Sequence, residues 1–436
     1  MPVFWQKEIE TMPRPELEKL QLERLRHIVD YADRHVPFYH KRLSELNICA
    51  DKIKCLSDVQ HLPLTTKEDL RDNYPFSLFA RPMREIVRTH ASSGTTGKPI
   101  VVGYTRNDLS AWSDQVARLC AAVGVTDEDI AQISFGYGLF TGALGLHYGL
   151  EKIGVAIVPI SSGNTRRQLM LMEDFGVTVL IATPSYATYL SEVAYEQGIR
   201  DKLKLRVGLF GGEGCTPEMR AKIEENMGIL STDNYGLSEL GGPGVSGECE
   251  YRCGLHFAED HFLPEIVDSD TLLPKGAGED GELVVTTLTK EGMPMIRYRT
   301  KDITRLHYDV CECGRTHVRM DKVKGRSDDM LIIKGVNVFP SQIESVLMTI
   351  PDIGAHYQLI IRRDGLMDSL EVKVELVAGA YLVEEYRKLE QLRNHVREQL
   401  RSVLQLDVKA TLVEPKSLER FEGKARRILD LREKPQ

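Results

Sequence analysis

The sequence predicts an α/β fold built from a large N-terminal domain and a smaller C-terminal one. Between residues 130 and 210, short apolar runs alternate with amphipathic segments, as buried parallel strands and their covering helices do. From about Gly281 the pattern changes to strands of more antiparallel character. After Gly325 the chain starts again as a mixed module whose length suits an independent domain. We therefore expect domains at residues 1–325 and 326–436.

The N-terminal part is expected to begin with a helix. Apolar residues recur at helical spacing over residues 15–32, and Pro37 then breaks the pattern. A loop-rich stretch is expected from there to about Asp69. Residues 100–104 have the pattern of a short strand, and an apolar helical face follows at residues 109–119.

The α/β region supplies four predicted strands and the turns that follow them. The apolar runs cover residues 130–135, 155–160, 177–181 and 205–210. Polar or glycine-containing turns come after three of them, at residues 134–137, 183–185 and 211–213. Because ligands of open α/β sheets bind at the carboxyl ends of the strands, we expect these turns to line a site.

The C-terminal part is predicted to mix strands and helices. Residues 282–286 and the alternating residues 369–376 predict strands, and an apolar stripe over residues 389–403 predicts a helix. Ser341 and Glu344 have the spacing of a capping box, in which each side chain bonds a free amide at a helix start.

Composition narrows the class of protein. Of the 436 residues, 42% are hydrophobic and 28% are charged, which is typical of a globular protein. The formal net charge of -8 argues against nucleic acid or an anionic membrane as a default partner. No run approaches the ~20 apolar residues of a membrane span, and the N-terminus lacks the layout of a signal peptide. We expect a cytoplasmic protein, and a homodimer is left open.

A loop rich in glycine and hydroxyl residues is the strongest local motif. The hydroxyls and free amides of such a loop can wrap phosphate oxygens, and its lysine adds a point charge. Serine at its first position and Pro99 after the lysine distinguish it from a Walker loop. An ordinary polar surface turn is the alternative. The loop consists of Ser92, Ser93, Gly94, Thr95, Thr96, Gly97 and Lys98.

Other residues that could bind a nucleotide or a metal ion follow at wide intervals along the chain. The ring of Tyr235 can stack on a purine, and Glu239 offers an oxygen ligand for magnesium. Asp302 suits a ribose diol, and Lys424 stands alone after a glycine near the C-terminus. Taken alone, each of these residues could also be an ordinary solvated charge, part of a turn or a partner in a salt bridge. Their order along the chain is what points to one site.

That order resembles the adenylate-forming enzyme superfamily, which contains acyl-coenzyme A synthetases, luciferases and peptide-synthetase adenylation domains. The motifs are SSGTTGKP, YGLSE, YRTKD, GRSDD, IIKGVNVFPSQIE and the late lysine. Within the superfamily, the segments FGYGLFTGALG, GLHFAEDHF and GVNVFPSQIE are similar to phenylacetate–coenzyme A ligases. The resemblance runs from about Pro15 to the C-terminus. It implies a large multi-sheet N-terminal domain and a smaller, mobile α+β C-terminal domain.

The resemblance also implies a two-step reaction that uses ATP, magnesium and coenzyme A. An aryl carboxylate, phenylacetate or a related arylacetate, attacks the α-phosphate of ATP and gives an acyl-adenylate and pyrophosphate. The thiol of coenzyme A then displaces AMP and forms a thioester. Two competing hypotheses remain: an adenylyltransferase that passes the adenylate to another acceptor, and a degenerate nucleotide-binding module.

Roles for individual residues follow from the same resemblance. The loop from Ser92 to Lys98 would hold the β- and γ-phosphates, and Glu239 the magnesium ion. Asp302 would bind the ribose hydroxyls, with Arg326 nearby. The hinge of the small domain would lie at Asp328, and Lys424 would enter the site only for adenylation. The adenine would meet Gly212, Glu213, Asn234 and Tyr235, with Gly236 beside both the nucleotide and the acid.

The acid is expected to bind after the strand that ends near Phe135. Its walls are expected to include Phe135, Tyr137, Gly138 and Phe140, together with Gly236. Aromatic walls suit a compact aryl group better than a long alkyl chain. The alternative is that these aromatic residues belong to the core.

Four of the eight cysteines lie close to a histidine in two segments. Thiols stay reduced in the cytosol, and structural zinc takes four thiolate or imidazole ligands. We favour Cys249, His256, Cys311 and Cys313, with Cys253 as a substitute for Cys249. His261 and His317 are weaker candidates. Because the spacing matches no standard zinc-finger formula, isolated buried thiols are the alternative.

Overall fold

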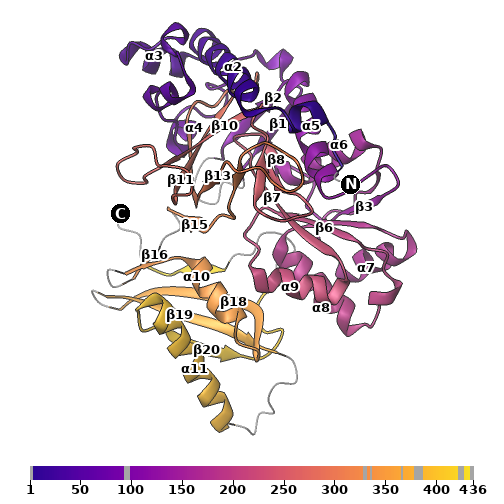
Figure 1. Cartoon of the computed structure of the whole chain (residues 1–436). Coiled ribbons are helices and arrows are strands. Elements are labelled where there is room, and N and C mark those ends of the chain that lie inside the picture. Colours follow the sequence, from indigo (N-terminus) through magenta and orange to yellow (C-terminus); the bar gives the residue numbers. More distant parts are fainter. Residues whose placement is uncertain are drawn as a thin grey trace. The chain divides into compact units, whose positions relative to one another are not determined.

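The structure is a computed structural model of the chain, coloured along the sequence in Figure 1. It describes residues 3–92, 99–327, 331–333, 336–364, 367–377, 386–420 and 427–432. The chain divides into two compact units. The first unit comprises Met1–Ala182, Asp201–Gly212 and Ile229–Val323, and the second Thr183–Arg200, Glu213–Gly228 and Lys324–Gln436. A domain boundary between residues 325 and 326 stays a prediction.

A nine-stranded sheet lies at the centre of the first unit, with the strand order β13-β14-β9-β8-β7-β6-β5-β3-β4. Its parallel strands are β3 (Ile130–Ile133), β4 (Ala156–Val158), β5 (Val179–Ala182), β6 (Val207–Gly211) and β7 (Leu230–Leu237). The four strands predicted from apolar runs are therefore confirmed. Because they are neighbours in one sheet, their carboxyl ends share one edge, and the turns predicted to line a site follow that edge.

The rest of the first unit is antiparallel, as the change of pattern after Gly281 predicts. Further strands of the large sheet are β8 (Gly242–Glu248), β9 (Leu255–Phe257), β13 (Leu306–His307) and β14 (Arg319–Met320). A separate antiparallel set consists of β10 (Phe262–Val267), β11 (Gly281–Thr287) and β12 (Tyr298–Thr304). A hairpin joins β1 (Arg88–Ala91) and β2 (Val101–Tyr104).

Helices cover the strands of the first unit, and one prediction about them is wrong. The helices are α1 (Lys7–Glu10), α2 (Arg14–His35), α3 (Pro37–Glu45), α4 (Lys67–Asp72), α5 (Arg106–Ala122), α6 (Thr141–Ile153) and α7 (Thr165–Asp174). The stretch expected to be loop-rich after Pro37 begins instead with α3. Proline is accepted in the first helical turn because its missing N–H has no intrahelical acceptor there. Tyr39 and Leu43 of α3 are buried and hold the helix on the core.

The second unit has its own core and sheet. Its helices are α8 (Pro184–Glu196), α9 (Pro217–Met227), α10 (Pro340–Met348) and α11 (Tyr386–Leu404). Its strands are β15 (Gly325–Arg326), the β16 (Leu331–Ile333) and β17 (Val336–Val338) hairpin, β18 (Ile353–Asp364), β19 (Met367–Leu376), β20 (Lys409–Val413) and β21 (Ile428–Asp430). The strands β18 to β21 form one sheet, against which α10 and α11 pack (Figure 1).

The predicted capping box does not form. Helix α10 begins at Pro340, so Ser341 lies inside its first turn, and the Ser341 hydroxyl donates to the carbonyl of Lys324 (2.6 Å). Glu344 pairs with Arg427 instead of a backbone amide. Phe339 precedes the helix, and its N–H donates to Gln342 Oε1 (3.1 Å). The capping box predicted at Ser341 and Glu344 is therefore wrong, because the helix begins one residue before Ser341.

Among the described residues, no helix is both long enough and apolar enough to cross a bilayer.

Candidate active site and metal centre

The base of the predicted phosphate loop lies between β1 and β2. The N–H of Ser92 donates to the carbonyl of Ile100 (2.9 Å), and the N–H of Ile100 donates to the Ser92 hydroxyl (3.0 Å). Ser92 therefore closes the two ends of the loop onto each other. The other loop residues, Ser93, Gly94, Thr95, Thr96, Gly97 and Lys98, lie outside the described residues.

The segment expected to bind the acid lies beside this loop base. Leu139 is the link, because its carbonyl accepts from the N–H of Ala91 (3.0 Å) and lies 3.0 Å from Nδ1 of His90. Both contacts tie the segment after β3 to the end of β1. The segment expected to bind the acid is thus held beside the base of the predicted loop.

The aromatic residues of that segment differ in exposure. Phe135 is buried, whereas the side chain of Phe140 is 37% exposed, and the two ring centroids lie 6.3 Å apart. The hydroxyl of Tyr137 lies 3.1 Å from Nδ1 of His147, and burial raises the pKa of that hydroxyl. Phe135 therefore fits the alternative that it belongs to the core. Tyr137 and Phe140 remain accessible candidates for the walls of an acid pocket.

Tyr235 and Asp302, predicted to hold the adenine and the ribose, are brought together. The Tyr235 hydroxyl donates to Asp302 Oδ2 (2.6 Å), although the residues lie on β7 and β12. The carboxyl group of Asp302 is nearly buried. The pair therefore presents an oriented carboxylate beside an aromatic ring, which is a combination suited to a nucleoside.

Gly236 marks a very close approach of two strands. An added Cβ there would lie 1.7 Å from the carbonyl oxygen of Gly242, so no larger residue fits without movement of the backbone. The register of β7 and β8 shifts at this point, as in a β-bulge. The register shift lies between Tyr235 and Gly236, just before Ser238 and Glu239.

Glu239, the predicted magnesium ligand, is buried and held from two sides. Its Oε1 accepts from the Tyr298 hydroxyl (3.2 Å), and its carbonyl accepts from Lys290 Nζ (2.7 Å). Ser238 next to it contacts Thr141, with 3.2 Å between the two hydroxyl oxygens. Magnesium is commonly held by one or two carboxylates together with substrate phosphates, so a single oriented carboxylate fits this ion.

Lys290 was not identified from the sequence. It is buried, its ammonium group lies 5.1 Å from the ring centroid of Tyr104, and burial lowers its pKa to about 8. Surface lysines are so common that one lysine in a loop carries no signal by itself. The surrounding TLTKEG segment offered no spacing rule that would have singled it out.

The remaining predicted nucleotide residues are distributed over both units. Asn234 is buried, and its Nδ2 donates to the carbonyl of Phe210 on the neighbouring strand β6 (2.8 Å). Gly212 has a positive φ of 85° at the end of the first unit's strand β6. In the second unit, Glu213 Oε1 accepts from the N–H of Ser185 (2.7 Å), and Arg326 lies on β15. Asp328 and Lys424 lie outside the described residues.

The four favoured metal ligands form a compact cluster. One ligand atom from each of Cys249, His256, Cys311 and Cys313 lies within 4.8 Å of all the others, and all four residues are buried. The Sγ atoms of Cys249 and Cys311 are 3.8 Å apart, and Cys313 Sγ is 3.5 Å from His256 Nε2. These cysteines are free, so no disulfide accounts for the cluster.

Two distances within the cluster match the edges of a zinc tetrahedron. With Zn–S near ~2.3 Å and Zn–N near ~2.05 Å, tetrahedral angles require S–S edges of about 3.8 Å and S–N edges of about 3.6 Å. The Cys249–Cys311 and Cys313–His256 distances agree with those edges. Cys253, the substitute ligand, is exposed and donates to the carbonyl of Tyr251 (3.3 Å). The donor set therefore fits zinc with Cys249 in the fourth place.

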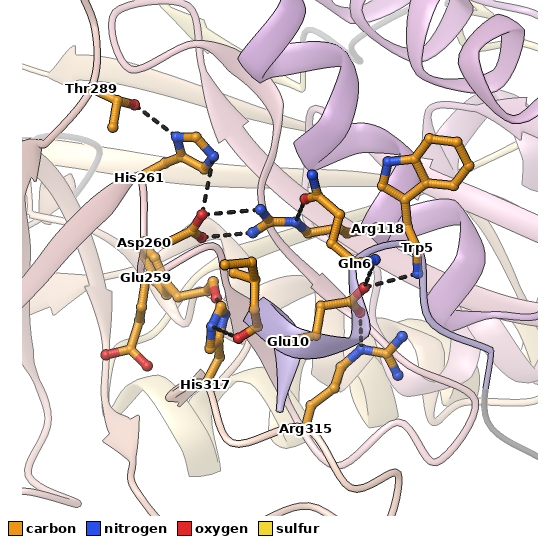
Figure 2. A network of polar contacts seen from close by, with 12 residues as sticks. Trp5, Gln6, Glu10, Arg118, Glu259, Asp260, His261, Thr289, Arg315 and His317 are labelled. Carbon is orange, nitrogen blue, oxygen red and sulfur yellow. Dashed lines mark hydrogen bonds and ion pairs between the residues drawn. The ribbon is translucent and has the colours of Figure 1, made fainter. Parts of the chain in front are cut away.

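The weaker histidine candidates belong to a buried polar network (Figure 2). His261 lies between Asp260 (Nε2–Oδ2 3.2 Å) and the hydroxyl of Thr289 (Nδ1–Oγ1 2.7 Å). Arg118 donates to both carboxylate oxygens of Asp260 (2.6 and 3.0 Å). His317 contacts the carbonyls of Phe257 and Ile9. The network joins segments that are far apart in sequence, so no spacing pattern could have predicted it.

The fold and these sites define an AMP-binding enzyme. Residues 15–289 match the family described as AMP-binding enzyme, and residues 335–432 match the AMP-binding enzyme C-terminal domain. Among solved structures, 2-hydroxyisobutyryl-CoA ligase in the postadenylation state, in complex with 2-HIB-AMP, has a TM-score of 0.91 at 29% identity. That match covers 98% of this chain and 92% of that one. The predicted adenylate-forming fold is thus confirmed.

Curated relatives narrow the class further. The phenylacetate-coenzyme A ligase of Thermus thermophilus is 48% identical over 444 residues, covering 99% of this chain and 100% of the relative. The protein of the same name from Escherichia coli is 46% identical over 427 residues and covers 97% of each chain. The chain belongs to the phenylacetate–coenzyme A ligase family of AMP-binding enzymes.

Proposed function

We propose that this chain ligates phenylacetate to coenzyme A through an acyl-adenylate, consuming ATP and releasing AMP and pyrophosphate. The observation that carries this proposal is the identity of 46–48% to four phenylacetate-coenzyme A ligases over nearly the whole chain. The hydrogen bond between Tyr235 and Asp302 supports a nucleotide site in the first unit.

In the first step, a carboxylate oxygen of the acid bonds to the α-phosphorus of ATP while the bond to the leaving pyrophosphate breaks. Such an in-line displacement needs positioning and charge neutralisation more than covalent help. The loop from Ser92 to Lys98 binds the β- and γ-phosphates, and Asp302 binds the ribose diol. Lys424 opposes the negative charge of the transition state. Magnesium, which Glu239 would hold, neutralises phosphate charge when it is bound.

The base is held between backbone and an aromatic ring in this proposal. Tyr235 stacks on the adenine, and its hydroxyl keeps the Asp302 carboxylate oriented toward the ribose. Arg326 is proposed to contact the nucleotide. The adenine edge meets Gly212, Glu213, Asn234 and Gly236.

In the second step, the sulfur of coenzyme A bonds to the acyl carbon, and AMP leaves with the electron pair of the broken bond. Lys424 has no task in this step. We propose that the small domain, residues 326–436, rotates about Asp328 and withdraws Lys424 before coenzyme A binds. One cleft then serves two reactions in turn.

The acid pocket is proposed to accept a compact aryl group. Tyr137 and Phe140 supply its aromatic walls, and Phe135 supports them from the core. The contact with His147 orients the Tyr137 hydroxyl, and the tyrosine ring is proposed to face the substrate. The resulting prediction is a preference for arylacetates over fatty acids.

The proposal includes one resident metal and a location. Zinc on Cys249, His256, Cys311 and Cys313 is supported by the compact cluster and by the agreement of two of its interatomic distances with tetrahedral edges. We place the protein in the cytoplasm, where the thiols stay available as ligands. A homodimer is part of the proposal, and light scattering of the purified protein checks it.

A panel of acids tests the function. AMP release by the purified protein is measured with phenylacetate, substituted arylacetates, benzoate and hexanoate, each with and without coenzyme A. We expect rapid AMP formation with phenylacetate only when coenzyme A is present to turn over the adenylate. Rapid turnover without coenzyme A would instead support transfer of the adenylate to another acceptor, and activity with hexanoate alone would refute the aryl pocket.

A further inference from the structure

Two of the proposed metal ligands lie in an irregular loop. Residues 308–318, all of which are described, join the short strands β13 and β14 and adopt neither helix nor strand. Cys311 and Cys313 belong to this loop, whereas Cys249 follows β8 and His256 lies on β9. A metal would therefore cross-link a loop that has no backbone ladder of its own to two strands of the large sheet. Such a cross-link removes conformational freedom that the loop otherwise keeps.

The residues directly after Cys313 hold the N-terminal segment, defined here as residues 3–12. Arg315 donates through Nε to Glu10 Oε2 (2.8 Å) and through Nη2 to the carbonyl of Val3 (2.6 Å). Thr316 donates through its N–H to the carbonyl of Glu10 (3.1 Å) and through its hydroxyl to that of Met12 (2.6 Å). These contacts join the loop to both ends of the N-terminal segment.

Glu10 is the centre of this attachment, and it is buried. Its Oε1 accepts from the N–H groups of Trp5 (2.9 Å) and Gln6 (2.7 Å), while Oε2 accepts from Arg315. The guanidinium of Arg315 also lies 4.6 Å from the ring centroid of Phe4. One carboxylate therefore both closes the first turn of the segment and receives the cation from the loop.

A second attachment leads to helix α5. The indole Nε1 of Trp5 donates to Asp114 (2.9 Å), and Arg118 donates to Oε1 of Gln6 (2.6 Å). Arg118 continues to Asp260, as Figure 2 shows. The segment is thus held on one side by a regular helix and on the other by the irregular loop.

The segment has little stability of its own. Helix α1 consists of four residues, Lys7–Glu10, and isolated helices shorter than ~12–15 residues are marginal in water. Its order must therefore come from its attachments. The helix attachment does not depend on the metal. On the loop side, Arg315 and Thr316 lie between the proposed ligand Cys313 and the pair His317 and Val318, which contact Phe257 and Glu259.

We propose that zinc on Cys249, His256, Cys311 and Cys313 anchors the N-terminal segment by fixing the 308–318 loop. This inference rests on the proposed zinc site and goes beyond it, because it assigns the metal a task at a distance. The metal holds Cys311 and Cys313, these residues place Arg315 and Thr316, and Arg315 and Thr316 hold residues 3–12.

Hydrogen–deuterium exchange of the full-length protein tests the anchor. Peptides that cover residues 3–12 and 308–318 are followed in the protein as purified, after zinc removal by a chelator, and after zinc is added back. We expect exchange in both peptides to rise by about tenfold or more on removal, since a single lost hydrogen bond changes an opening equilibrium by roughly 2- to 12-fold. Added zinc should restore both.

Two variants separate the steps. Glu10→Gln weakens the attachment without touching a ligand, so it should speed exchange at residues 3–12 while the zinc content stays at one per chain. Cys253→Ser changes a nearby exposed thiol outside the cluster and should leave both zinc content and exchange unchanged. Cys311→Ser should lose zinc and reproduce the chelated state.

The proposal is overturned if metal removal frees the 308–318 loop while residues 3–12 keep their protection. It is also overturned if the purified protein contains no zinc, since no metal would then act. Ligase activity is measured on the same samples with phenylacetate. An inactive protein that shows the expected zinc-dependent exchange would refute the proposed ligase function and leave the anchor standing.

Discussion

The Tyr235–Asp302 pair offers a sharp test of the nucleotide site. Tyr235→Phe removes one hydroxyl and keeps the ring that we propose stacks on adenine. The lost contact is 2.6 Å long and ends on the carboxylate of Asp302, a residue that is 4% exposed. Hydrogen bonds to charged groups contribute about 1.5–3 kcal/mol, which corresponds to roughly 10- to 150-fold in a binding constant. We expect the KM for ATP to rise within that range, with a smaller change in kcat.

The assay is phenylacetate-dependent exchange between pyrophosphate and ATP, which reports the first half-reaction alone. Asp302→Asn should raise the KM for ATP at least as much. The double variant should cost less than the sum of the two single variants, because both act on one contact. Tyr39→Phe is the matched control: it removes another buried hydroxyl contact, to Thr65 (3.1 Å), outside the proposed nucleotide site. It should lower the melting temperature and leave the KM for ATP unchanged.

The reasoning is refuted if Tyr235→Phe and Asp302→Asn behave like Tyr39→Phe. A lower melting temperature with an unchanged KM for ATP would mean that the pair only supports the packing of β7 against β12.

Three further predictions address catalysis, packing and pH. Lys424→Ala should lower the rate of adenylation by ~10²–10³, which is the scale for loss of one preorganised charge. Thioester formation from supplied acyl-adenylate should stay largely intact. Equal losses in single-turnover assays of the two steps would exclude the domain rotation. Gly236→Ala should lower the melting temperature and the yield of folded protein, because its Cβ would meet the carbonyl oxygen of Gly242 at 1.7 Å; an unchanged melting curve would contradict this. Burial lowers the pKa of His261 to about 4, below the ordinary 6.5. As the pH drops, the unfolded chain therefore binds a proton at this histidine before the folded protein does. The free energy of unfolding should then fall between about pH 6.5 and pH 4. In His261→Gln, urea denaturation midpoints should fall less steeply over this window, and a slope equal to that of the unchanged protein would show that other groups dominate.

Much of the fold could be predicted because apolar runs report burial directly. The runs that became β3, β4, β5 and β6 are short, uninterrupted and separated by amphipathic segments, a pattern that parallel sheets require. The prediction of a loop-rich stretch after Pro37 is wrong because a proline that ends one helix can also begin the next. Which of these occurs depends on the burial of later residues, which is a tertiary property.

The candidate sites also contain some residues that sequence patterns predict and others that only the packing reveals. The Cys/His cluster could be predicted because thiols and an imidazole near one another in two segments suggest a shared metal ion, and the choice between Cys249 and Cys253 needed their burial. Lys290 and Glu10 could not be predicted. Each carries an ordinary charged side chain, and a key partner of each lies far away in sequence: Glu239 for Lys290 and Arg315 for Glu10. Their importance therefore arises only from packing.

The central claim is that one chain catalyses two coupled half-reactions on phenylacetate, and resolving those half-reactions tests it most directly. Purified protein is incubated with ATP, magnesium and phenylacetate, first without and then with coenzyme A, and all products are quantified by mass spectrometry. The account predicts pyrophosphate exchange without coenzyme A. After coenzyme A is added, it predicts equal amounts of phenylacetyl-coenzyme A, AMP and pyrophosphate. Formation of ADP and phosphate, or exchange without any thioester after coenzyme A is added, would contradict it.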